Sequence, residues 1–507
     1  MKKFLALILA LVMALSLVAC GEKAPAADDG AADAGTEVKD TIRFQIKNEP
    51  TSVDLQNDGT MLGGLLCDQI YGKLVTFNEK SEIVGELAES WEWNDDFTQI
   101  TFKIRENAKF SDGSDITADD FIYTFSTDSA KANTYMAPIA SMEAPDAKTL
   151  VLNLKSSNSS MLKFLTTYHT GVVPAGSMEA TDIARGATAY SGPYALAKWE
   201  LGQDMVLEAN PYWWNAENVA IKTVDYEFIA DENSALVALE AGEIDFMFMA
   251  ATLGVTSVET IAANDKLATI ACDQATAGML CLNFVMPELD DVNVRQAMNL
   301  ALDRAAIAKV STTGTPAGNV FTAPYFGDDY IPGHDAPAVD LAKAKEFMAA
   351  SAYPNGFTVE LKTPVMFSKA AAIVQSNLAE IGITVEITEI DASIWVDSMI
   401  KGDYQMAFMT YGNLINDLTG FINLYDPAAA LHFNFDTDST SFDLMSAAFS
   451  VAGADRTAAL TEFADFCEAD LPYLGLFMEN AIYGHNADLY VPTPSGCGYD
   501  IAGMYWK

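Results

Sequence analysis

Two stretches of the chain alternate apolar and polar residues with a period of two. Ile100, Phe102 and Ile104 alternate with polar side chains, and leucines recur at every second position over 150–154. Alternation of this kind is typical of a strand that buries one face. The pattern therefore predicts one strand at 100–104 and another at 150–154.

Apolar residues in the second half of the chain recur at helical spacing instead. One stripe joins Val294 to Leu302 through positions i+3, i+4 and i+7, as expected for a helix packed on a sheet. Asp340 can cap a second helix, and a third ends near Gly382, directly before an alternating segment at 383–387. A helix followed by a strand is the repeating piece of a βαβ layer, so we expect an α/β architecture.

The first twenty residues predict export. Lys2 and Lys3 precede an apolar run over 4–18 that is 15 residues long, shorter than the roughly 20 residues that span a membrane. Such a run fits a cleaved secretory signal at 1–20. Its ending, LVAC, resembles the bacterial lipoprotein box, in which the thiol of the last cysteine, here Cys20, receives a diacylglyceryl group. An ordinary signal peptide that happens to contain a cysteine is the alternative.

The segment after Cys20 predicts a tether. Residues 21–40 are rich in Ala, Asp and Gly and have no apolar periodicity, a composition that stays flexible and solvated. With a lipid on Cys20, we expect the mature protein to work outside the cytoplasm, anchored to the bacterial cell membrane.

The composition bounds the size and the partners of the folded part. A chain of 507 residues, of which 50% are hydrophobic, can form two or three compact lobes. Its formal net charge of −41 disfavours binding to nucleic acid or to anionic lipid headgroups. We interpret the acidity as a solvated extracellular surface.

The cysteines leave one question open. Five remain after Cys20, an odd number, so at least one is not in an internal disulfide. Cys272 and Cys281 lie in apolar, strand-like sequence, where a bridge and two buried thiols are both compatible with the pattern.

The sequence lacks the motifs of common hydrolases and metal sites. Its four histidines form no HExxH pair, and no GxSxG elbow is present. The segment 436–447 begins like a calcium loop but lacks the turn glycine and the final acid. We therefore predict no enzyme activity, no metal and no cofactor. A carboxylate pair of a glycoside hydrolase stays an alternative, because only its spatial separation would identify it.

Five ordered blocks, spread over nearly the whole mature chain, resemble the peptide-type (family 5) extracellular solute-binding proteins of ABC importers, the class of oligopeptide- and dipeptide-binding proteins. The blocks are LAESWE at 87–92 with FKIRENAKFSDG at 102–113 and TADDF at 117–121, SGPY at 191–194, NPYW at 210–213, AGEID at 241–245, and DVNVRQA at 291–297 with LDR at 302–304.

The resemblance implies a two-lobed α/β fold of the type II periplasmic-binding-protein kind, with an extra subdomain inserted in the first lobe. By analogy, the first lobe comprises 41–85, 191–275 and 481–507. The inserted subdomain comprises 86–190 and the second lobe 276–480. Clefts between lobes are where small molecules are buried, so we expect the ligand there.

In that family an acid shortly after a strand of the second lobe often holds the amino group of the ligand. The matching segment here, TYGNLIND at 410–417, places Leu414 at the usual acid position and Asp417 three residues later. A buried ammonium without a carboxylate partner is unfavourable, so Leu414 argues against ordinary capture of a peptide amino terminus. Asp417 can take over that role, or it can be a capping or exposed loop acid. In the ligand-free protein we expect its carboxylate to face water.

Position in the same resemblance gives further candidates for ligand contact: Asn413, Asn416, Tyr411, Trp395, Met366, Phe367 and Met61. The sequence thus predicts a lipid-anchored, monomeric protein that captures a short peptide or peptide-like solute and delivers it to the permease of an ABC importer. An oligosaccharide or another non-peptide solute is the first alternative, because the usual acid is missing. A sensor component that presents its ligand to a receptor, and a secreted hydrolase, are the others.

Overall fold

The structure is a computed structural model that describes residues 39–57, 60–132, 135–249, 252–311, 314–318, 329–331, 333–412, 417–493 and 499–507. Cys20, the predicted signal peptide and nearly all of the predicted tether lie outside the described residues. The folded part extends from residue 40 to residue 507.

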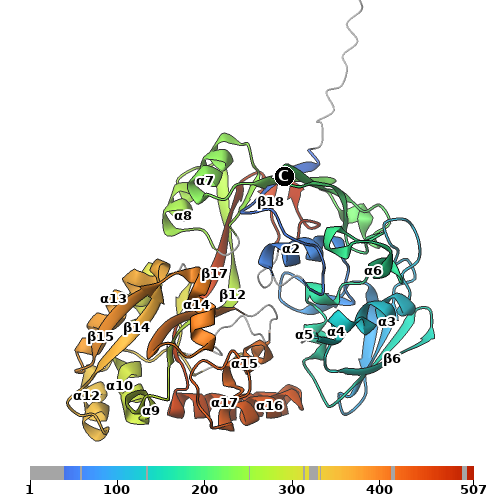
Figure 1. Ribbon diagram of the computed structural model, residues 1–507. Helices are drawn as coiled ribbons and strands as arrows, with labels where there is room; N and C mark the ends of the chain where they lie inside the picture. The colour runs from blue at the N-terminus through green and yellow to red at the C-terminus, as the bar shows by residue number, and fades with distance from the viewer. Residues whose placement is uncertain are drawn as a thin grey trace, which may run out of the picture. The chain divides into compact units, whose positions relative to one another are not determined.

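One sheet of 11 strands runs through the folded part (Figure 1). Its order is β15-β14-β16-β12-β17-β11-β1-β10-β9-β8, and β13 pairs with β17 outside this path. The strands are β1 (Thr41–Ile46), β8 (Tyr194–Glu200), β9 (Asp204–Ala209), β10 (Thr223–Phe228), β11 (Phe246–Phe248), β12 (Leu267–Leu282), β13 (Thr315–Pro316), β14 (Thr358–Pro364), β15 (Thr384–Ile390), β16 (Met406–Gly412) and β17 (Leu474–Asn486).

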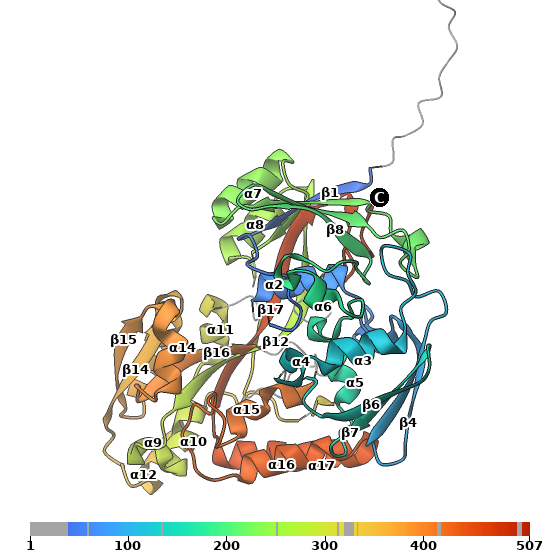
Figure 2. The same cartoon turned by 45° about the vertical axis from the view of Figure 1, so that its right-hand side comes forward.

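The two long strands β12 and β17 join two lobes. They pair antiparallel along most of their length. At one end β17 also pairs with β11 near His485, and at the other end β12 pairs with β16 from Thr276 to Leu282. We call the part built on β1 and β8–β11 the first lobe, and the part built on β14–β16 the second lobe. Figure 2 shows β12 and β17 running from one to the other.

The second lobe packs helices on both faces of its strands. Met279 and Cys281 of β12 point into one core and Leu280 and Leu282 into the other, as the alternation of a strand requires. The first core packs against α14 (Ala392–Ile400), α15 (Ile422–Tyr425), α16 (Thr440–Phe449) and α17 (Gly453–Asp470). The second packs against α9 (Pro287–Asp290), α10 (Val292–Ala301), α11 (Arg304–Ser311), α12 (Leu341–Ala350) and α13 (Ser368–Ala379).

The predicted pattern of this lobe is confirmed. The stripe that begins at Val294 is the buried side of α10. The Asp340 carboxylate caps α12 by accepting a hydrogen bond from the backbone N–H of Lys343 at 3.0 Å. Gly382, with a φ of 88°, follows α13 and turns the chain into β15, a left-handed conformation that glycine adopts without strain.

The first lobe has a core of its own. Phe44 of β1, Tyr226 of β10 and Tyr483 of β17 pack with Leu66 of α2 (Met61–Ile70). On the other side, α7 (Glu232–Ala241) and α8 (Val255–Ala262) cover Met247. The last two strands, β18 (Leu489–Tyr490) and β19 (Tyr505–Trp506), form a two-stranded pair. This pair lies beside the core of the first lobe that contains Phe44.

A separate four-stranded antiparallel sheet, β4-β5-β7-β6, is inserted between β3 and β8. Ile100 pairs with Leu152 and Phe102 with Leu150, which confirms both predicted strands. The two-stranded pair of β2 (Val75–Phe77) and β3 (Ile83–Gly85) precedes this inserted subdomain. The subdomain contains β4 (Ala88–Trp93), β5 (Gln99–Ile104), β6 (Ile139–Asp146), β7 (Thr149–Leu154), α3 (Ala118–Ser126), α4 (Asp128–Ala132), α5 (Met161–Phe164) and α6 (Ser177–Ala180). The predicted domain boundaries themselves stay predictions.

The structure also bears on the cysteines and on membrane-spanning helices. Cys281 and Cys467 are buried thiols outside any disulfide, whereas the side chain of Cys272 and all of Cys497 lie outside the described residues. No helix in the described ranges is long and apolar enough to cross a membrane.

Candidate functional site

In the second lobe, the carboxyl ends of three strands meet at one edge. β14 is parallel to both β15 and β16, with Pro364 beside Ile390. The last residue of β16, Gly412, pairs with Thr276 of β12, at the place where β12 enters this lobe from the first. Ligands of open α/β sheets bind outside the carboxyl ends of the strands, so this edge is the candidate site.

The first lobe turns the same kind of edge toward the crossing strands. β1 is parallel to β10 and β11, and β11 is antiparallel to β17, with Met247 beside Gly484. The carboxyl end of β11 therefore points along β17 toward the second lobe. Gln45 holds these ends together, because its side chain donates to Ile229 O at 2.8 Å and accepts from Phe248 N at 2.9 Å.

Five of the predicted contact residues lie after or at these carboxyl ends of the second lobe. After β14, Met366 is 74% exposed while Phe367 is buried and stacks on Phe408 at 4.7 Å. After β15, Trp395 lies on α14 and is buried in the core. Tyr411 is at the end of β16, and Asp417 follows it. Residues that are far apart in sequence are thus brought to one edge.

The other predicted contacts are not described. Asn413 and Asn416 lie outside the described residues, and so does the side chain of Met61. Their roles stay predictions.

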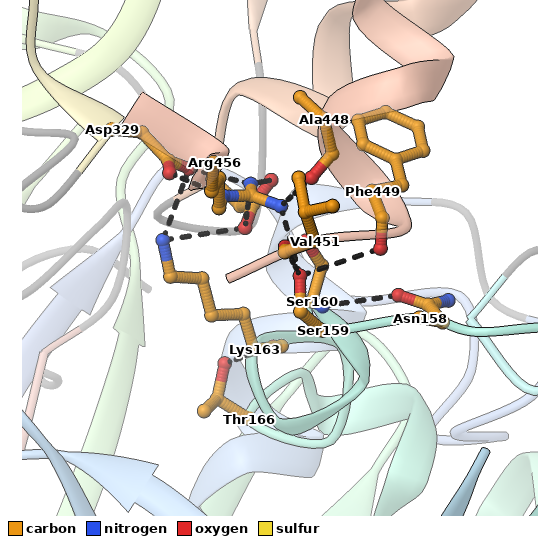
Figure 3. Close-up of polar contacts among 11 residues, drawn as sticks. Asn158, Ser159, Ser160, Lys163, Thr166, Asp329, Ala448, Phe449, Val451 and Arg456 are labelled. Carbon is orange, nitrogen blue, oxygen red and sulfur yellow. Dashed lines mark hydrogen bonds and ion pairs between the residues drawn. The ribbon is translucent and has the colours of Figure 1, made fainter. Parts of the chain in front are cut away.

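Asp417 is part of an ion cluster with Asp329, Lys163 and Arg456. Figure 3 labels the last three of these residues. Arg456 Nη2 lies 3.2 Å from Asp417 Oδ1 and 3.1 Å from Oδ2, and Lys163 Nζ lies 3.3 Å from Oδ2. Arg456 also donates to both oxygens of Asp329, at 2.7 Å and 2.9 Å, and Lys163 Nζ donates to Asp329 Oδ2 at 3.1 Å. Two cations and two carboxylates balance within this ion cluster.

The two carboxylates need this balance of charge because both are buried. Asp417 is 0% and Asp329 is 1% exposed, and an uncompensated charge at such a depth is strongly unfavourable. Burial works to lower the pKa of Lys163 and of Arg456, but the two carboxylates outweigh it and raise both pKa values. We expected the Asp417 carboxylate to face water; instead, two cations of the protein itself surround it.

The ion cluster lies where the two lobes touch. Lys163 belongs to α5 of the inserted subdomain, whereas Arg456 belongs to α17 of the second lobe. Beside them, Ser159 N donates to Phe449 O at 3.1 Å, and Ser159 Oγ donates to Val451 O at 2.6 Å. Arg456 Nη1 reaches Ser159 Oγ at 3.3 Å. The segment before α5 is therefore docked on the turn between α16 and α17.

Aromatic rings lie on the inserted subdomain close to Lys163 of the ion cluster, where Tyr135 contacts Phe164 with ring centres 5.9 Å apart. Tyr135 of the inserted subdomain stacks on His169 with ring centres 5.3 Å apart. Burial, and then the nearby Tyr411, raise the pKa of Tyr135 to about 12. Tyr411 in turn packs against Phe421 at 5.5 Å.

One carboxylate at the crossing has a different environment. Glu479 lies on β17 between Met478, which pairs with Ala277, and Asn480, which pairs with Asp273. Burial alone raises the pKa of Glu479 to about 7. Within the described part of the chain, its side chain has no hydrogen-bond or ion-pair partner.

Sequence reasoning missed Lys163, Asp329, Arg456 and Glu479. For the first three no local pattern gave a signal, because Lys163 and Arg456 are separated by nearly three hundred residues and meet only in the fold. Glu479 did leave a signal: it is the one charged residue in the otherwise apolar or amide-bearing run 474–483.

A separate pocket of about 480 Å³ lies between the loop after β1 and the inserted subdomain. Its lining is the loop after β1 with Asp54 and Asn57, the segment 126–129, and Met178, Glu179 and Ile183. Among the described residues, no group of three or more His, Cys, Asp or Glu side chains could hold a metal ion.

The family model described as bacterial extracellular solute-binding proteins, family 5 Middle, matches residues 82–430, more than half of the chain. The glutathione-binding protein GsiB of Escherichia coli is 27% identical over 354 residues, which are 68% of this chain and 68% of that protein. A solved structure of the binding protein AgaA of A. tumefaciens in complex with agropinic acid has 24% identity and a TM-score of 0.73, covering 92% of this chain and 99% of that one. The periplasmic binding protein DppA from Helicobacter pylori, in complex with the peptide STSA, has 22% identity and a TM-score of 0.73, covering 92% and 98%.

Proposed function

This chain belongs to the bacterial extracellular solute-binding proteins of family 5, and from that premise we propose that it captures a short peptide or peptide-like solute between its lobes and delivers it to the permease of an ABC importer. Proteins of this family bind the substrates of ABC transporters and are not enzymes. The ligand, rather than a reaction, is therefore what defines the function of the chain.

The observation that carries the proposal is the placement of both carboxyl edges at the crossing strands. β14–β16 in the second lobe and β1, β10 and β11 in the first all end toward the crossing. A ligand there would touch both lobes at once, and closure of one lobe on the other requires such a ligand to bind the closed form more tightly.

A peptide is supported by two of the similar proteins. GsiB is named for glutathione, and DppA holds the peptide STSA. In this chain, Tyr411, Trp395, Met366, Phe367, Asn413, Asn416, Met61 and Asp417 are proposed to form or support the second-lobe wall and the entrance of the cleft. The exposed Met366 offers an adaptable apolar surface for a ligand side chain.

A non-peptide solute is the second candidate. AgaA was solved with agropinic acid, and in this chain the Asp417 carboxylate already has two cationic partners from the protein. Both features favour a ligand that is not held by its amino group at Asp417.

Outside the cleft, we propose that Cys20 carries the lipid and that residues 21–40 tether the folded part to the cell membrane. Cys20→Ala removes the thiol that would accept the diacylglyceryl group and leaves the signal intact. The variant is expected to be exported but neither labelled by a radioactive fatty acid nor retained in the membrane fraction. A labelled, membrane-bound Cys20→Ala protein would contradict the anchor.

Calorimetric titration of the purified chain tests the function itself. We expect a pool of tripeptides to bind and to be recovered unchanged. Binding of an oligosaccharide pool instead would favour the second candidate, and cleavage of either pool would contradict a purely binding role.

A further inference from the structure

The ion cluster leaves no charge for a ligand ammonium at Asp417. Lys163 and Arg456 already balance Asp417 and Asp329 at distances of 2.7 to 3.3 Å. An ammonium placed there would be a third positive charge for two buried carboxylates, which is unfavourable at such a depth. A cationic ligand therefore needs a different carboxylate.

Glu479 occupies an irregular point of the crossing strands. Asp273 of β12 pairs with Asn480, and Ala277 pairs with Met478, so the three residues 274–276 stand opposite residue 479 alone. Irregularities of this kind interrupt the ladder, bend the strand and re-aim side chains next to functional sites. The last of the three, Thr276, pairs with Gly412 at the carboxyl end of β16, which places Glu479 beside the second-lobe edge of the candidate site.

The described residues around Glu479 supply no counter-charge. Its side chain is mostly buried. Neither carboxylate oxygen is among the fully buried atoms that lack a hydrogen-bond partner, so each oxygen keeps some exposed surface. Burial is the only cause that raises its pKa to about 7, so no described cation on β12, β13 or β17 pairs with it. A mostly buried carboxylate with a raised pKa and no described cation beside it is a candidate for a functional role, because it takes part in no structural ion pair.

We propose that the Glu479 carboxylate is the anchor for a cationic group of the ligand, such as the ammonium of a peptide amino terminus. The inference rests on the proposed function, because it places the ligand in the same cleft. Charge-assisted hydrogen bonds between an ammonium and a carboxylate are short and strong, and a bound cation would supply the partner that no described residue supplies.

The test compares one peptide pool in two forms. A pool of tripeptides with free amino termini and the same pool after N-acetylation are titrated into wild type, Glu479→Gln, Asp417→Asn and the matched control Glu380→Gln, which changes an exposed glutamate of the same lobe. We expect wild type and Glu380→Gln to prefer the free pool by about tenfold or more. Glu479→Gln should lose that preference.

The other outcomes separate the inference from the function. A preference that survives in Glu479→Gln, or that is lost only in Asp417→Asn, overturns the assignment to Glu479. Equal binding of both pools by wild type also overturns it and leaves the proposed function standing. If neither pool binds, the peptide function fails, and native mass spectrometry of the ligand that copurifies decides: a ligand without an amine or guanidine overturns the inference, and a cationic ligand that Glu479→Gln no longer retains supports it.

The Glu479→Gln protein is expected to fold, because the amide keeps the shape of the side chain and removes a buried charge. Its melting temperature at neutral pH should be equal to or above that of wild type. The melting temperature thus shows whether a loss of binding by Glu479→Gln is due to the changed side chain or to unfolding.

Discussion

Asp417 and Asp329 share the same two cations, Lys163 and Arg456. Replacing Asp417 by asparagine leaves Lys163 and Arg456 with a single carboxylate in a buried site. Breaking a buried ion pair typically costs about 3–5 kcal/mol, so Asp417→Asn should lower the free energy of unfolding by about 3 kcal/mol in urea denaturation. Asp335→Asn, at an exposed position of the same lobe, is the control. Equal stability of the two variants would show that the ion cluster does not form as described.

Glu479 makes stability depend on pH. Its pKa is raised from 4.5 to about 7 by burial, so the folded protein holds this proton more tightly than the unfolded chain does. The resulting stabilisation is complete below pH 4.5 and is lost as the pH rises through 7.

Wild type should therefore lose stability relative to Glu479→Gln between pH 5 and pH 7.5, by on the order of 2 kcal/mol. Urea denaturation of both proteins at the two pH values measures this difference. A difference that does not change with pH would mean that Glu479 ionises normally.

At the residue scale, the sequence led to one part of the site and not to the other. The resemblance at 410–417 identified Tyr411 and Asp417, and both lie where the lobes meet. It did not reveal the partners of Asp417, because Lys163 and Asp329 come from distant segments without a pattern of their own. The burial of Asp417 depends on those partners, so the expectation of a water-facing carboxylate could not be corrected from sequence.

Among the elements, α12 gives a direct test of a predicted cap. The Asp340 carboxylate accepts from Lys343 N at 3.0 Å, and an N-cap of this type contributes about 1 kcal/mol. Asp340→Ala should lower the free energy of unfolding by about that amount. Asp340→Asn preserves the capping acceptor and should stay within a few tenths of wild type. Equal losses in both variants would show that the carboxylate acts through its charge instead.

Elements with local periodicity were predictable and elements defined by long-range pairing were not. The strands at 100–104 and 150–154 and the helix that begins near Val294 follow from spacing within a few residues. The 16-residue strand β12 does not, because its two halves belong to different lobes and its register with β17 breaks between Asp273 and Ala277. Glu479 lies opposite that break. The break results from the pairing of distant strands, so no local pattern predicts it.

On the scale of the whole molecule, Lys163 is the charge that one lobe contributes to the buried acids of the other. Lys163→Met keeps the length of the side chain and leaves two carboxylates with Arg456 alone. We expect this contact between the lobes to be weakened by about 2 kcal/mol, or roughly thirtyfold in the ratio of molecules with the contact to molecules without it. Small-angle X-ray scattering should then give a larger radius of gyration for Lys163→Met.

Lys155→Met is the matched control for this comparison, because Lys155 is an exposed lysine of the same subdomain whose side chain makes no described polar contact. It should scatter like wild type. If Lys163→Met also scatters like wild type, the lobe contact through the ion cluster does not hold the lobes together.

The measurement that tests the central claim most directly is native mass spectrometry of the gently purified chain, before and after a pool of tripeptides is added. We predict a complex that exceeds the mass of the chain by one small solute, and an exchange of that solute for intact tripeptides of the pool. A chain that shows only its own mass in both samples, or that returns the tripeptides as cleaved products, would contradict capture of a peptide-type solute between the lobes.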